Sequence, residues 1–247
     1  MSSNNLLELK DKVKKSNNIV FFGGAGVSTA SGIPDFRSAT GLYNKENNKG
    51  YSPEYMLSHE FFSDHPDEFM DYVKNNLIYD EAKPNKCHLA LKKLEDTGKL
   101  RGVITQNIDS LHQMAGSGNV VEIHGNLRDY YCTKCGKSFD MDEVRKSDFN
   151  IECPDCKGVV RPDVVLYGEP LDYSNISQAI DLIQNAEILI VGGSSLMVYP
   201  AAGFIDYFTG DTLVLINKTK TNYDSRADYV FYEDIGTVME KLADIQP

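Results

Sequence analysis

The stretch Ile19–Ser38, "IVFFGGAGVSTASGIPDFRS", decides the fold class. An apolar run of strand length passes directly into Gly24-Ala25-Gly26, as at the first turn of a dinucleotide-binding βαβ unit. Backbone amides of such a turn are expected to point at phosphate oxygens, helped by the positive end of a following helix. A dehydrogenase fingerprint has a third glycine where this chain has Thr29, and the chain then continues to Phe36-Arg37. The stretch therefore predicts a nucleotide-binding turn of another type.

Further apolar runs of strand length follow, separated by helical patterns. This alternation predicts an α/β fold with a doubly wound parallel sheet, a Rossmann-like arrangement. The expected strands are Ile19–Phe22, Gly102–Thr105, Val120–Ile123, Glu187–Val191, Thr212–Ile216 and Tyr229–Tyr232. Helices are expected at 5–16, 88–98, 176–186, 200–208 and 234–244.

Two segments interrupt the alternation and predict a second, smaller lobe. Residues 38–84 are rich in Tyr, Phe, Asn and Glu and are expected to form short helices and loops, whereas residues 129–161 carry four cysteines. The α/β domain is then expected to comprise residues 1–37, 85–128 and 162–247. An open α/β sheet binds its ligand outside the carboxyl ends of its strands, so we expect the site in the cleft between the lobes.

Composition excludes several classes of protein. The net charge of −11, from 36 acidic and 25 basic residues, disfavours a nucleic-acid partner, which needs clustered Lys and Arg. This charge suits attraction of a basic partner such as a lysine-bearing peptide, although solubility alone also explains it. The N-terminus lacks a secretory signal pattern, and no apolar run approaches the ~20 residues that span a bilayer. We therefore expect a cytoplasmic chain without a membrane partner.

The cysteines form two pairs of metal-ligand spacing. Cys132-x-x-Cys135 and Cys153-x-x-Cys156 are separated by 17 residues. Each pair turns two thiolates toward one ion, and four thiolates complete a tetrahedral zinc shell. Such a shell leaves no position for water, so the sequence predicts one structural zinc ion. Two disulfides are the alternative, disfavoured in the cytoplasm.

Small or polar residues follow four of the expected strands. Because the carboxyl ends of parallel strands meet at one edge of a sheet, we expect these residues to line the cleft. They are Gln106, Asn107, Asp109 and His112 after the second strand, His124 after the third, Ser194 and Ser195 after the fourth, and Asn217 after the fifth. A helix start capped by Asp109 is the alternative at the second strand.

In this order, the motifs resemble the sirtuin family of NAD-dependent protein-lysine deacylases, especially its short bacterial and archaeal members. The motifs are Gly24–Thr29 with Ser31–Arg37, Thr105–Asp109, His124-Gly125 and the two cysteine pairs. The resemblance spans about Ile19 to Lys241. Thr29 departs from the dehydrogenase pattern but not from that of the sirtuins.

The resemblance implies NAD as co-substrate and assigns roles to residues. His124 would be the general base, and Asn107 would order the ribose or an attacking water. NAD contacts would come from Ala25, Thr29, Phe36, Arg37, Gln106, Ile108, Asp109, Ser194, Ser195, Asn217 and Asp234. An acyl-lysine protein substrate would pair as an added strand with "RPDVVLYGEPL", through Val165, Tyr167, Gly168 and Glu169.

The implied reaction transfers an acetyl or other neutral acyl group from lysine to ADP-ribose and releases nicotinamide. Family members that remove acidic acyl groups carry a Tyr-x-x-Arg pair where this chain has Tyr43-Asn44-Lys45-Glu46, and Glu46 would repel a carboxylate. ADP-ribose transfer to protein and a non-catalytic NAD sensor remain alternatives. A dehydrogenase is disfavoured, because the third glycine and the acidic ribose partner are both missing.

Overall fold

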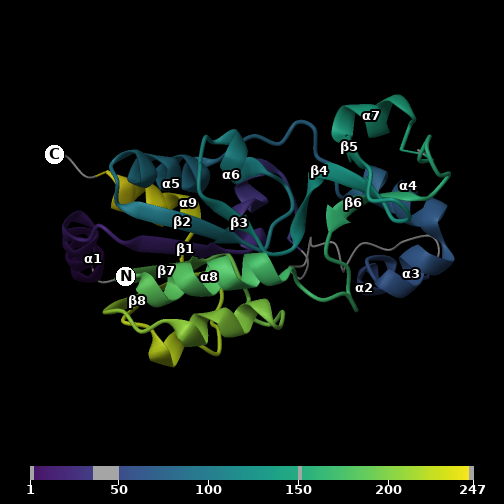
Figure 1. The fold of residues 1–247 in the computed structure, drawn as a ribbon. Helices are drawn as coiled ribbons and strands as arrows, with labels where there is room; N and C mark the ends of the chain where they lie inside the picture. The colour runs from purple at the N-terminus through teal and green to yellow at the C-terminus, as the bar shows by residue number, and fades with distance from the viewer. Residues whose placement is uncertain (1–2, 36–49, 150–151, 245–247) are drawn as a thin grey trace.

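The computed structural model describes residues 3–35, 50–149 and 152–244. It consists of a larger α/β lobe and a smaller lobe, seen on the left and right of Figure 1. Within the described residues, no helix has both the length and the apolar character needed to cross a bilayer.

The larger lobe is built on the predicted parallel sheet, which is confirmed. Its six strands lie in the order β3-β2-β1-β7-β8-β9. They are β1 (Ile19–Gly23), β2 (Leu100–Thr105), β3 (Val120–Glu122), β7 (Ile188–Gly192), β8 (Thr212–Ile216) and β9 (Tyr229–Phe231). The connections turn in opposite directions on either side of the β1–β7 pair, and an open α/β sheet binds its ligand at such a point.

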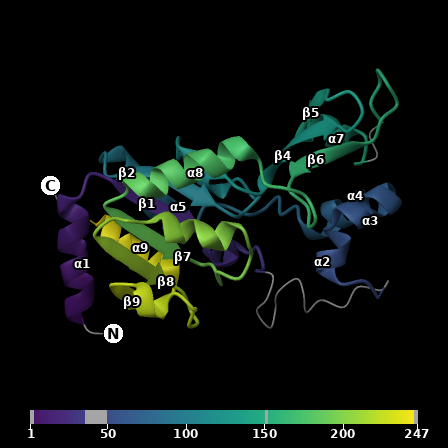
Figure 2. The ribbon, with the colours of Figure 1, turned by 60° about the horizontal axis from the view of Figure 1, so that its bottom comes forward.

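Helices cover both faces of this sheet (Figures 1 and 2). Phe21 belongs to the core shared with α1 (Ser3–Lys15), α5 (Lys86–Asp96) and α9 (Ile235–Ala243). Phe22 points the opposite way, into the core shared with α8 (Tyr173–Asn185) and the 3₁₀ helix Ala201–Tyr207. Because both faces are buried, the strands are continuous apolar runs. The helix expected at 200–208 is present as the 3₁₀ helix Ala201–Tyr207.

The turn after β1 differs from the expected one. Two 3₁₀ turns, Ala25–Val27 and Thr29–Ser31, replace the anticipated helix. The amides of Gly24 and Gly26 donate to the carbonyls of Gly192 and Gly193, at 3.2 and 2.8 Å, so the expectation that they point at phosphate is wrong. The physical reason is close packing of the turns after β1 and β7. Gly193 has φ 61°, and a Cβ there would lie 2.5 Å from the Val27 nitrogen.

The smaller lobe combines two distant chain segments. One supplies α2 (Pro53–Met56), α3 (His59–Asp64) and α4 (Pro66–Asn76). The other supplies β4 (Gly125–Cys132), β5 (Ser138–Asp140), α7 (Met141–Lys146) and β6 (Val160–Val164), with the antiparallel order β5-β4-β6. Both contribute to one apolar core that includes Phe61, Phe69, Tyr130 and Val160. The expected limits 129 and 161 fall inside β4 and β6.

The two lobes meet where β4 begins, directly after His124. Gly125 pairs with Val164 of β6, and a Cβ on Gly125 would lie 1.9 Å from the Asp163 carbonyl oxygen. Gly125 has φ 72°, which glycine adopts readily, and its lack of a Cβ allows β4 to pair closely with β6 directly after His124. The short helix α6 (Leu111–Met114) follows β2 in the chain.

Candidate active site

A cavity of about 680 Å³ lies between the lobes, at the carboxyl ends of the parallel strands. The predicted site residues that line it are Ala25, Thr29, Gln106, Asn107, Ile108, Asp109, His124, Val165, Tyr167, Gly168, Glu169, Ser194, Ser195 and Asn217. Asp234 does not line it; its carboxylate caps α9 by accepting from the Thr237 amide at 3.0 Å. Phe36, Arg37 and residues 43–46 lie outside the described part of the chain.

His124 has a defined tautomer in this cavity. Its Nδ1 lies 3.0 Å from the Gln106 carbonyl oxygen. Because a carbonyl oxygen only accepts, Nδ1 carries the proton and Nε2 retains the lone pair. Burial lowers the pKa of His124 below its usual range, and the hydrogen bond to Gln106 only partly opposes this. The imidazole is therefore a neutral base at pH 7.

Asp109 is held by the turn after β1. Its Oδ2 accepts from the Ser28 hydroxyl at 2.5 Å, and its Oδ1 accepts from the Leu111 amide at 2.9 Å. The Ser28 oxygen in turn accepts from Asn107 Nδ2 at 3.0 Å. Burial raises the pKa of Asp109, and the hydrogen bond from Ser28 acts against this shift. Ser28 was not among the predicted site residues, although its position in "GAGVS" indicates it.

Polar groups that follow β7 and β8, Ser194 and Asn217, meet Gln106 on the other side of the cavity. Ser194 donates through its amide to Asn217 Oδ1 at 3.0 Å, and its hydroxyl lies 3.4 Å from Gln106 Oε1. Gln106 Nε2 and Asn217 Nδ2 are buried, and no described residue gives either a hydrogen-bond partner. Buried donors without partners are costly, so this wall suits a ligand rich in oxygen acceptors, as NAD is.

The expectation that His112 lies at the cleft is wrong. His112 is buried, does not line the cavity, and packs against Phe21 and His88. The helical alternative explains this: a helix does start here, with Ser110 at the N-cap position and Asp109 accepting from the Leu111 amide, and α6 turns His112 into the core. Gln106, Asn107 and Asp109 therefore reach the cleft, and His112, three positions after Asp109, does not.

The segment 165–169 is fastened on both sides. The Val165 amide donates to the His124 carbonyl at 3.0 Å, and residues 57–59 pair with Tyr167. The Glu169 carboxylate accepts from the buried Arg161 guanidinium, from the Leu166 amide at 2.9 Å and from His59. This carboxylate is thus part of the support of the segment. Arg161 itself stacks on Phe62, with 4.8 Å from Cζ to the ring centroid.

The small lobe also supplies apolar cavity wall that sequence analysis missed. Leu57, Phe69, Leu77 and Tyr79 line the cavity. Only docking of the short helices onto β4 and β6 brings these residues to the cleft. The apolar periodicity of this segment predicts that one face is buried, but it does not predict which element or cavity that face contacts.

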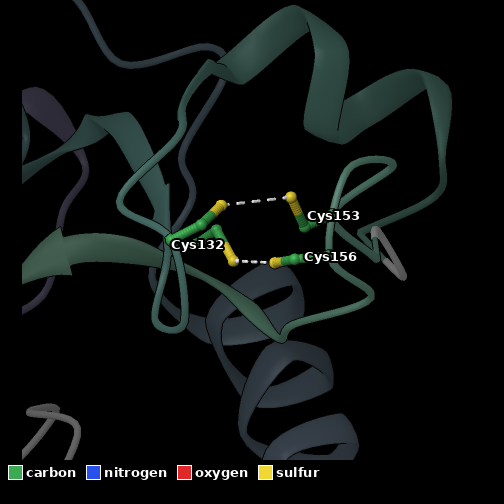
Figure 3. A group of neighbouring side chains, drawn as sticks. Cys132, Cys153 and Cys156 are labelled. Carbon is green, nitrogen blue, oxygen red and sulfur yellow. Dashed lines mark hydrogen bonds between the residues drawn. The ribbon is translucent and has the colours of Figure 1, made fainter.

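The four predicted metal ligands come together at the far end of the small lobe. All four Sγ atoms lie within 4.8 Å of one another. The Cys132–Cys156 and Cys135–Cys153 sulfur atoms are 3.5 and 3.6 Å apart (Figure 3). Disulfides need about 2.05 Å, whereas a ZnS₄ tetrahedron with bonds of about 2.3 Å has edges of about 3.8 Å. The cluster therefore fits zinc and not disulfides.

The fold and the cleft together define an α/β nucleotide-binding enzyme with a cysteine-rich second lobe. The model of the Sir2 family matches residues 24–200. The chain therefore belongs to the Sir2 family, as the resemblance to sirtuins implied.

Relatives and solved structures agree with this assignment. An NAD-dependent protein deacetylase from Clostridium acetobutylicum is 55% identical, over 95% of this chain and 96% of that relative. One from Staphylococcus aureus is 46% identical, over 97% of this chain and 98% of that relative. A Sir2 structure with deacetylated p53 peptide and 3'-O-acetyl ADP-ribose superposes with a TM-score of 0.88, at 38% identity over 96% of each chain. Another, with p53 peptide and NAD+, has a TM-score of 0.84 at 38% identity, covering 98% of this chain and 97% of that one.

Proposed function

We propose that this cleft removes acetyl groups from lysine side chains of proteins, with NAD as co-substrate. The observation that carries the proposal is the neutral His124, whose Nε2 retains its lone pair in the cavity that holds the buried amides of Gln106 and Asn217. The likeness of the chain to deacetylases along nearly its whole length supports the same reaction.

NAD would supply the ribose hydroxyl that accepts the acetyl group; nicotinamide would leave from the same ribose, and one water would be consumed in the release of the free lysine. In this chain, Ala25, Thr29 and Gln106 would hold the diphosphate and the adjoining ribose. Ser194, Ser195 and Asn217 would hold the adenosine half, and Ile108 and Asp109 would line the nicotinamide pocket. Phe36, Arg37 and Asp234 stay predictions from the resemblance.

His124 then acts as general base. Its Nε2 accepts the proton of the hydroxyl that attacks the acyl carbon, while the Gln106 carbonyl keeps Nδ1 protonated and the ring oriented. Asn107, linked to Asp109 through Ser28, is placed to order the ribose or an attacking water. A base so placed contributes roughly 10²–10⁴-fold to the rate.

The substrate is an acyl-lysine segment of a protein, bound along residues 165–169. Val165 and Tyr167 already use their amides within the protein, so the added strand would pair through other backbone groups of this segment, such as those of Gly168. Acylation removes the lysine charge, so the stem enters an apolar wall without an ion partner. Phe69 and Leu77 belong to that wall.

The four cysteines hold one zinc ion in this proposal. A closed shell of four thiolates has no place for a reacting water, so the ion stabilises the small lobe and takes no part in the reaction.

The test is a reaction of the purified protein with NAD and an acetyl-lysine peptide, followed by mass spectrometry. Wild type should release free lysine peptide, nicotinamide and acetylated ADP-ribose. His124→Ala should lose at least about 10²-fold in rate, while His65→Ala, a change in the small lobe, should keep the activity. ADP-ribose attached to protein would favour the transferase alternative. Absence of NAD consumption with acetyl and longer neutral acyl peptides would favour the NAD sensor.

A further inference from the structure

The turn that carries Asp109 contains a strained residue. Ser110 has φ 64° and ψ 13°, the left-handed conformation that residues other than glycine adopt at a cost. It is buried and lies between Asp109 and the first residue of α6. A relaxed Ser110 would turn Asp109 away from Ser28 and from the Leu111 amide, the two groups that hold its carboxylate.

The side chain of Arg128, a residue of β4, reaches the turn that carries Asp109 and Ser110. Its Nη1 donates to the Ser110 hydroxyl and to Glu122 Oε1 at 2.8 Å. Its Nη2 donates to Glu122 Oε2 at 2.7 Å, so the ion pair is bidentate. Glu122 is largely buried, with 12% of its side chain exposed, and Asn126 donates to the same carboxylate at 3.3 Å. Glu122 therefore orients the Arg128 guanidinium independently of Ser110.

The contact between Arg128 and Ser110 belongs to a set of hydrogen bonds that join residues 106–110 to residues 124–128. His124 Nδ1 meets the Gln106 carbonyl at 3.0 Å, and the Leu127 amide donates to the Ile108 carbonyl at 3.1 Å. Arg128 and Ser110 form the next link along the same two segments. Glu122, which orients Arg128, stands two residues before His124.

We propose that Arg128 is a positioning residue: with Glu122 as its support, it holds Ser110 in the left-handed conformation and thereby fixes the Asp109 carboxylate in the cleft. We call Arg128, Glu122 and Ser110 the arginine clamp. None of the three residues lines the cavity. The proposal rests on the proposed function only for its activity readout, because NAD binding reports on Asp109 independently of turnover.

Glycine at position 110 provides the decisive test, because glycine adopts this conformation without a clamp. Arg128→Met keeps the aliphatic stem and should lower kcat/KM for NAD about tenfold and weaken NAD binding in calorimetry by a similar factor. The KM for the peptide should stay within about twofold, because segment 165–169 has its own support. The double variant Arg128→Met/Ser110→Gly should recover to within about threefold of wild type in both measurements.

Arg145→Met is the matched control. Arg145 pairs with Asp80 in the small lobe, and its side chain is 39% exposed against 41% for Arg128. It should remain within about twofold of wild type, as expected for an ordinary surface ion pair. Thermal unfolding of all four proteins separates a loss of fold from a loss of positioning.

The clamp is refuted if Ser110→Gly fails to restore the Arg128→Met protein, or if Arg128→Met behaves like Arg145→Met. Should Arg128→Met unfold, Glu122→Gln, which keeps the size of the support and removes its charge, should show a smaller loss that the same glycine restores. If wild type binds NAD without deacetylating peptide, the proposed function fails, and the calorimetric comparison still decides the clamp.

Discussion

Two buried histidines, His88 and His112, lie against each other with ring centroids 4.6 Å apart. Burial lowers the pKa of His88 to about 4 and that of His112 to about 3, where the neighbouring His88 acts in the same direction. The His88 Nδ1 accepts from the Asn85 amide at 3.2 Å. Both rings are therefore neutral in the folded protein at pH 7, and a proton on either would be buried without a counter-charge.

This pair predicts how stability depends on pH. In the unfolded chain both histidines bind protons near pH 6.5, whereas the folded protein resists protonation down to about pH 4 and 3. Their contribution is complete above pH 6.5 and is lost as the pH falls below it. His112→Phe should reduce the slope of unfolding free energy against pH, between pH 6.5 and 4.5, by about 1.4 kcal/mol per pH unit.

Denaturant titrations at several pH values measure this slope. Gln178→Ala is the control, because Gln178 is exposed on α8 and its removal takes away no titratable group, so the slope should stay unchanged. An unaltered slope in His112→Phe would show that His112 takes up its proton equally in both states.

At the scale of elements, the N-terminus of α5 supports the loop that lines the cleft. The Asn85 side chain caps α5 by accepting from the Cys87 amide at 2.9 Å. Its Nδ2 donates to the Val27 carbonyl at 2.7 Å and to the Ser31 hydroxyl at 2.9 Å. A single side chain thus joins a helix start to the two 3₁₀ turns after β1.

Asn85→Ala should therefore weaken both stability and NAD binding. Loss of the cap costs about 1 kcal/mol, and the turns bearing Ala25 and Thr29 lose their anchor, so NAD affinity should fall several-fold. Asp140→Ala removes a similar capping box from α7, in the small lobe. It should cost similar stability and leave NAD affinity unchanged in calorimetry. Equal NAD affinity in both variants would contradict the anchoring role of Asn85.

The sequence predicts elements best where one physical cause dominates. The parallel strands are recognisable because burial on both faces requires continuous apolar runs. β4 and β6 escaped prediction because their sequences, with Arg, Asp, Asn and Pro, are not continuous apolar runs, and because their pairing joins residues about thirty positions apart, such as Tyr130 and Pro162. The helix expected after β1 fails because the residues there are small and end at Gly32, with φ 88°.

Some residues of the candidate site could be predicted from the sequence, and others could not. Strand-end residues such as His124 and Asn217 were predictable, because the carboxyl ends of parallel strands must meet. The contacts of Ser28 with Asp109, and of Arg161 with Glu169, depend on how loops and lobes dock, which local sequence does not determine.

At the scale of the molecule, the small lobe depends on its cysteine cluster. Cys132 and Cys153 belong both to that cluster and to the apolar core containing Phe61 and Phe69. Metal at the cluster would therefore stabilise the wall of the cleft some distance away.

Removal of zinc should accordingly unfold the small lobe first. The purified protein should contain about one zinc per chain. A strong chelator should increase hydrogen exchange in 125–164 and abolish peptide turnover, while β1, β7 and β8 stay protected. Readdition of zinc should restore both. A metal-free protein with unchanged exchange in 125–164 would contradict the zinc assignment.

The place of β1 in the sheet has a consequence for synthesis on the ribosome. β1 precedes the other five strands of its sheet in the chain, yet it lies in the middle of that sheet, between β2 and β7. Its partner β7 begins only at Ile188, and α8, which covers Phe22, begins only at Tyr173, so one edge of β1 and the ring of Phe22 stay uncovered through most of translation. Nascent chains with such edges are prone to aggregate and are typical clients of chaperones. The yield of active protein should therefore depend on the cell's supply of ribosome-associated chaperones.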